Sequence, residues 1–244
     1  MKAIKAVLSL VASLGVSTAF AQGTSYPPLS EYMMEPTAEI ALARSAAPVN
    51  VSEHATIKVF TATGYETAVQ GDNGFVCMVM RSWGAATFTP SATRDLVYYS
   101  KLRAPICFDP VASRTVLPAQ ELRAKLGIEG KDPEAIANRV ARAYASGELP
   151  KMESVAFAYM WSADSNLGPG VGAWHPHMMI YAPYYTNAML GGNKCGGPVP
   201  CVLDDAGTPF TVVVIPVHGT EAIKAKSALA QGASNTNPTN NDRE

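Results

Sequence analysis

The stretch TIKVFTATGYETAVQGDNGFVCMVMRSW (Thr56–Trp83) contains several expected β-strands joined by turns. Residues Thr56–Ala62 are rich in β-branched side chains, and a second, shorter strand is expected over Thr67–Gly71. The Asn-Gly pair within Asp72–Gly74 tolerates positive φ at both positions, so it predicts a tight hairpin turn. Phe75–Trp83 is then expected to be the returning strand of this hairpin.

The rest of the chain adds helices in the middle and more strands towards the end. One helix is expected from Pro36, and the clearest helical pattern follows Asp132, with Pro133 in its first turn. Further strands are expected over Ser154–Trp161, Trp174–Pro183 and Phe210–His218. Strands, then helices, then strands indicate an α+β fold. We expect a mostly antiparallel sheet of about five or six strands, with helices packed on one face.

Residues 1–21 have the features of a secretory signal peptide. Lys2 and Lys5 give a positive start, Ala6–Val16 is apolar, and Ala19–Ala21 fits the small-x-small rule for cleavage before Gln22. The alternative is a retained N-terminal membrane anchor, for which the apolar part is too short to span a bilayer comfortably. The signal predicts a periplasmic or secreted protein.

Residues 22–230 have the size of a single globular α+β domain, and the polar residues 231–244 are expected to form a disordered tail. The chain is 48% hydrophobic and 16% charged, with a formal net charge of −1, which is enough apolar content for a sizeable core. It has no basic cluster, so no nucleic-acid partner is expected. No later stretch approaches ~18 uninterrupted apolar residues, so the mature chain is expected to have no transmembrane segment.

The four cysteines are Cys77, Cys107, Cys195 and Cys201. Thiols tend to pair in the oxidising compartment that a signal peptide implies, and four cysteines allow three connectivities. Cys195 and Cys201 bracket the short sequence GGPVP, which favours a disulfide between them and leaves Cys77 to pair with Cys107. Metal binding by these cysteines is less favoured, because no C-x-x-C spacing is present.

The segment WHPHMMIYAP (Trp174–Pro183) is the strongest candidate for a site. On a strand, His175 and His177 point to one face, and Pro176 between them favours a strand start or edge that can meet solvent. With His218 as a third ligand, these histidines could bind zinc or copper. The alternative is that each histidine has a structural role and hydrogen-bonds to nearby backbone.

Aromatic side chains surround the glycine-rich loop that precedes this segment. Trp161, Trp174 and Tyr181 could form the walls of a small-molecule pocket. Alternatively, they form the margin of the core. Met78 and Met80 lie on an apolar strand, where methionine fills gaps in the core more often than it binds copper.

The segments GYETAVQGDNGFVC, RSW, CFDPVASRTVLP and WHPHMMIYAP together resemble an uncharacterised family of secreted bacterial proteins. The resemblance agrees with the signal peptide. It implies no activity, and it assigns no role to any residue.

Two hypotheses for the function follow from the sequence. No G-x-S-x-G, Walker A or G-x-G-x-x-G motif is present, so no reaction is indicated and the catalytic residues are unknown. The first hypothesis is a protein that binds a small ligand or a metal ion through the His-x-His strand, and the unusual strand favours it slightly. The second is a non-catalytic envelope or interaction protein with structural histidines.

Overall fold

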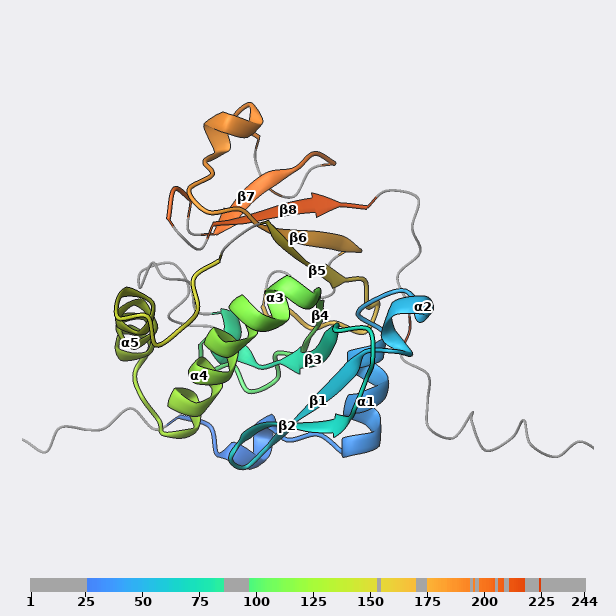
Figure 1. Ribbon diagram of the computed structural model, residues 1–244. Helices are drawn as coiled ribbons and strands as arrows, with labels where there is room; N and C mark the ends of the chain where they lie inside the picture. Colours follow the sequence, from blue (N-terminus) through green and yellow to red (C-terminus); the bar gives the residue numbers. More distant parts are fainter. Residues whose placement is uncertain are drawn as a thin grey trace, which may run out of the picture.

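An eight-stranded, mostly antiparallel sheet forms the centre of the computed structural model (Figure 1). The structure describes residues 26–85, 97–152, 155–169, 175–193, 195, 198–204, 206–208, 211–217 and 224. In spatial order, the strands are β2 (Gly64–Val69), β1 (Thr56–Thr61), β3 (Val76–Met80), β4 (Ala104–Phe108), β5 (Ala156–Met160), β6 (His177–Tyr181), β8 (Val212–Pro216) and β7 (Cys201–Asp204). The α+β class is confirmed, and the sheet has more strands than the five or six expected.

Five α-helices and three 3-10 turns accompany the sheet in the described residues. The helices are α1 (Pro36–Arg44), α2 (Val49–Ser52), α3 (Pro110–Thr115), α4 (Leu117–Ile128) and α5 (Pro133–Ala145), and the turns are η1 (Leu29–Tyr32), η2 (Ser82–Ala85) and η3 (Asn187–Leu190). No helix in the described part of the chain is long and apolar enough to cross a membrane. The expected signal peptide and the expected tail lie outside the described residues.

The helices cover both faces of the sheet, so the expectation of one covered face was wrong. On β3, Met78 and Met80 belong to the core under α3 and α4. The alternate side chains, Cys77 and Val79, pack on the opposite face with Leu42 of α1. A strand that is buried on both faces is apolar throughout, so its sequence does not reveal a second layer of helices.

The expected hairpin at Asp72–Gly74 is also absent, because β3 pairs with β1 rather than with β2. β1 and β2 form a hairpin through the turn at Ala62 and Thr63, and β3 then lies on the other side of β1, parallel to it. Ile57 is paired with Cys77 in this parallel ladder. The segment that follows β2 must therefore cross the start of β1.

Gly71 makes this crossing possible. A Cβ atom at this position would lie 2.3 Å from the carbonyl oxygen of His54 and from the backbone nitrogen of Thr56. Beyond it, the N–H of Asp72 donates to the carbonyl oxygen of His54 (2.9 Å), and the Asn73 side chain donates to the carbonyl oxygen of Val51 (2.8 Å). Asn73 and Gly74 therefore belong to the crossover between β2 and β3 and not to a hairpin.

Candidate functional site

Both predicted disulfides are confirmed. Cys77 is bonded to Cys107, and the two residues also face each other across the antiparallel strands β3 and β4. Cys195 is bonded to Cys201, so no cysteine is free. The first disulfide lies in the buried centre of the sheet, and the second closes a short loop before β7.

His177 is a buried residue at the start of β6, with 3% of its surface exposed. Its Nδ1 lies 2.9 Å from the carbonyl oxygen of His175. A carbonyl oxygen only accepts hydrogen bonds, so Nδ1 must carry a proton and donate it. Burial lowers the pKa of His177 below its ordinary value, which favours the neutral imidazole.

His175 is exposed and precedes β6, so the two imidazoles differ sharply in their access to solvent. His218 and Trp174 lie outside the described residues. Within the described ranges, no group of three or more His, Cys, Asp or Glu side chains could hold a metal ion. The predicted metal site at His175, His177 and His218 therefore stays a prediction.

Trp161 and Tyr181, two of the expected pocket residues, pack against different neighbours. Trp161 contacts Tyr159 edge-on, with ring centroids 5.2 Å apart. Tyr181 is buried in the core and packs near Phe108, at 6.5 Å between centroids. Burial also raises the pKa of Tyr181. Tyr181 pairs with Ala156, whereas Trp161 follows Met160 at the other end of β5, and the expected pocket stays a prediction.

A buried ion pair joins α1 to the end of β3, and sequence reasoning missed it. Arg81 Nη2 lies 2.9 Å from Glu39 Oε2, and both side chains are 0% exposed. Arg81 Nε also donates to the carbonyl oxygen of Tyr32 (2.7 Å), and the N–H of Phe60 donates to Glu39 Oε1 (3.1 Å). These bonds fasten η1 and α1 to the sheet. The sequence feature that could have indicated this pair is Glu39 itself, which lies on the same face of its helix as the apolar Leu42.

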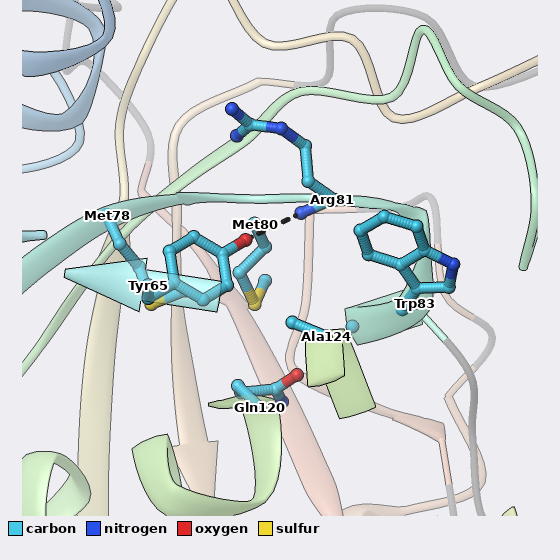
Figure 2. Close-up of a pocket in the computed structure, with 8 residues that line it drawn as sticks. Tyr65, Met78, Met80, Arg81, Trp83, Gln120 and Ala124 are labelled. Atoms are coloured by element: carbon cyan, nitrogen blue, oxygen red, sulfur yellow. Dashed lines mark hydrogen bonds between the residues drawn. The ribbon is translucent and has the colours of Figure 1, made fainter. Parts of the chain in front are cut away.

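A narrow gap lies between the β2–β3 end of the sheet and α4 (Figure 2). It is lined by Tyr65, Met78, Met80, Arg81, Trp83, Gly84, Gln120 and Ala124. Figure 2 shows the Tyr65 hydroxyl accepting from the backbone N–H of Arg81 (3.1 Å), while the guanidinium of Arg81 points away from the gap. The gap is too narrow for a water molecule. Met78 and Met80 therefore fill the core here.

Four exposed apolar side chains belong to the segment between β6 and β7. Tyr184, Tyr185, Met189 and Val199 are between 41% and 66% exposed. We call residues 182–201 the stapled lobe, because the Cys195–Cys201 disulfide closes it. In Figure 1 its helical turn η3, in orange, lies beyond β7 and β8, at the other end of the sheet from β2.

Polar side chains hold the stapled lobe against the edge of the sheet. Asn187 Oδ1 accepts from the N–H of Val202 (2.9 Å), and Asn187 Nδ2 donates to the carbonyl oxygen of the same residue (3.4 Å). Asn193 Nδ2 donates to the carbonyl oxygen of Pro200 (3.1 Å), which ties two parts of the lobe itself together. Leu190 packs on the buried Val202 and Val213. The lobe is thus anchored while its large apolar side chains face solvent.

Tyr184 has a strained backbone. It has φ 65°, and it is the one non-glycine residue with positive φ among those the structure describes. The left-handed conformation costs a bulky residue about 1 kcal/mol or more. Its N–H donates to the carbonyl oxygen of Thr208 (2.8 Å), yet the side chain is 63% exposed. The strain therefore presents an aromatic ring to solvent.

Comparison with protein-family models, curated proteins and solved structures finds no match for this chain. The structure shows an anchored segment with four exposed apolar side chains, the stapled lobe, and a buried histidine at the start of β6.

Proposed function

We propose that this is a periplasmic or secreted interaction protein, without a catalytic role, that contacts a partner protein through the stapled lobe. The observation that carries the proposal is the grouping of Tyr184, Tyr185, Met189 and Val199, all exposed, on one anchored segment. Large exposed apolar patches on soluble proteins mark interaction sites, and tyrosine and methionine are enriched at such interfaces. On this reading, His175 and His177 are structural.

The two disulfides support the proposed compartment. Disulfides form and persist in oxidising environments such as the periplasm and the extracellular space, and they are rare in the cytosol. The signal peptide expected from the sequence points to the same compartments. The mature chain is expected to begin at Gln22.

The proposal is tested by site-specific photo-crosslinking in cells that export the protein. A photoreactive amino acid at Tyr185 is expected to give a covalent protein adduct, whereas the same group at Val155 is expected to give none. Val155 is a suitable control because it is 63% exposed and apolar but lies outside the lobe. The absence of an adduct from Tyr185, or equal adducts from both positions, would contradict the proposal.

A second candidate function is binding of copper or zinc by His177. Its Nδ1–H bonds a backbone carbonyl oxygen, which is how the second ring nitrogen of metal-ligating histidines is usually held. Met160 is its direct partner across β5 and β6, and thioether with imidazole suits copper. Elemental analysis of the exported protein and of a His177→Ala variant tests this candidate. Metal in the parent and none in the variant would support it over the interaction proposal.

A further inference from the structure

We infer that the partner of the stapled lobe is a second copy of this chain, and that two lobes pack against each other around a two-fold axis. This inference rests on the proposed function and deepens it by naming the partner.

The lobe is almost free of charge. Lys194 is the sole charged residue between Tyr181 and Asp204 in the sequence, whereas 16% of the whole chain is charged. In a two-fold contact each surface patch meets the same patch on its copy, so charges of one sign would face each other. A segment with a single charged residue brings little such repulsion of its own, and homodimer interfaces are correspondingly more apolar than other protein contacts.

The contact is formed by side chains and not by extending the sheet. β7 is the last strand at this edge, where unpaired backbone groups would invite another strand. Asn187 already bonds both the N–H and the carbonyl oxygen of Val202. The edge is therefore closed at Val202, and the rings of Tyr184 and Tyr185 with the side chain of Met189 remain as the surface for the copy.

The strained backbone at Tyr184 fits this arrangement. Tyr184 is 63% exposed in the single chain, so packing of its side chain within the chain does little to offset the energetic cost of its left-handed backbone (φ 65°). Packing against a second copy would bury the ring and supply the missing stabilisation. A glycine at this position would adopt the same backbone without strain and would lack the ring.

A lipid surface fits the lobe less well. Segments that lie in a membrane interface combine apolar side chains with several lysines or arginines on the polar face. Lys194 alone is available here.

Sedimentation equilibrium of the mature protein, from micromolar to millimolar concentration, tests the inference. We expect a monomer–dimer equilibrium that weakens about tenfold or more in the double variant Tyr185→Ser, Met189→Ser, since a few residues at the centre of an interface supply most of its binding energy. The matched control Met33→Ser, Val155→Ser removes two exposed apolar side chains outside the lobe and should dimerise like the parent. Far-UV circular dichroism checks that both variants fold.

Tyr184→Gly provides a second, independent readout. It should weaken dimerisation while raising the melting temperature of the dilute monomer, because it removes both the ring and the strain. A parent protein that is monomeric at every concentration, or a dimer that survives in the lobe variants, would overturn the inference. Vesicle binding by a monomeric parent would also overturn it.

The same experiments separate the failure of this inference from failure of the proposed function. A monomeric protein that still gives a crosslinked adduct from Tyr185, with a mass other than that of two chains, overturns the second copy alone. A monomeric protein that gives no adduct overturns both. An adduct with the mass of two chains together with lobe-dependent dimerisation supports both.

Discussion

Glu39 occupies a position on α1 where the neighbouring buried residues are apolar. It lies on the same face as Leu42 and Ala43, and its carboxylate is matched by the guanidinium of Arg81 at 2.9 Å. Removing water from two charges is costly, and the pair is tolerated because backbone groups of Tyr32 and Phe60 bond them as well. Replacing only one residue of the pair should therefore cost more stability than the intact pair contributes.

Glu39→Ala should lower the free energy of unfolding by about 3–5 kcal/mol, because it leaves the charge of Arg81 buried without its partner. Urea unfolding measures the change. The double variant Glu39→Leu, Arg81→Met should recover much of the loss, since no buried charge remains. Glu148→Ala, which breaks the exposed pair with Arg139, is the control and should change stability little. Equal losses in Glu39→Ala and Glu148→Ala would refute this account.

The two histidines of the His-x-His strand should respond very differently to substitution. His177→Ala removes a buried ring and leaves the carbonyl oxygen of His175 without its donor, at a cost of about 1–3 kcal/mol. His175→Ala removes an exposed side chain and should therefore cost less than His177→Ala. Thermal unfolding of both variants measures the difference. Similar melting temperatures for the two variants would rule out a structural role of His177.

The pH dependence of stability gives a further prediction for His177. Burial lowers its pKa in the folded state below the ordinary value of 6.5, so the unfolded chain binds more protons between the two values. Stability from this residue is therefore complete above pH 6.5 and is lost as the pH falls from there towards the folded pKa. Denaturant titrations across this range should show the loss in the parent and a smaller loss in His177→Ala. An identical pH profile for both proteins would contradict the prediction.

Among the helices, strands and loops, the features that were predicted correctly from the sequence depend on residues that are close together in the chain. Asp132 caps α5 as expected, its carboxylate accepting from the N–H of Ala135 at 2.8 Å, and Ile136 and Val140 are buried. The disulfide pairing also followed from the short loop between Cys195 and Cys201. Loop closure and capping involve neighbours in the chain, so a single sequence carries the information.

The sequence could not predict features that depend on distant parts of the chain. The Asn-Gly turn is compatible with a hairpin, and only the approach of Gly71 to His54 and Thr56 makes it a crossover. Likewise, alternation places His175 and His177 on one face of a strand but does not say whether that face is covered. The stapled lobe was missed because it has no periodicity, although its lack of charge is visible in the sequence.

Gly71→Ala tests the crossover between β2 and β3. The added Cβ would lie 2.3 Å from backbone atoms at the start of β1, and backbone cannot move aside as a flexible side chain can. We expect a loss of about 3 kcal/mol in urea unfolding, at the upper end of the usual cost of overpacking. Gly147→Ala is the control: it has φ 77° but nothing within 4 Å of the added atom, so it should cost only about 1 kcal/mol. A smaller loss at Gly71 than at Gly147 would contradict the crossover geometry.

At the scale of the whole molecule, the two disulfides stabilise different regions. Cys77–Cys107 spans 30 residues and ties the central strands β3 and β4 under α1. Cys195–Cys201 spans 6 residues and closes only the stapled lobe at the edge of the sheet. Since the constraint on the unfolded chain grows with the length of the closed loop, the first disulfide should contribute more to global stability.

The two disulfides, removed one at a time, should therefore affect the free energy of unfolding and the dimerisation constant in opposite order. Cys77→Ala, Cys107→Ala should cost about 3–4 kcal/mol, and Cys195→Ser, Cys201→Ser about 2 kcal/mol, by loop-closure entropy. Dimerisation should show the opposite order, because loss of the second disulfide loosens the anchored segment that carries Tyr184, Tyr185 and Met189. The first variant, while folded, should dimerise like the parent. Urea unfolding and sedimentation equilibrium on the same samples measure both quantities. If Cys195→Ser, Cys201→Ser loses stability but keeps the dimerisation constant of the parent, the lobe is not the interface.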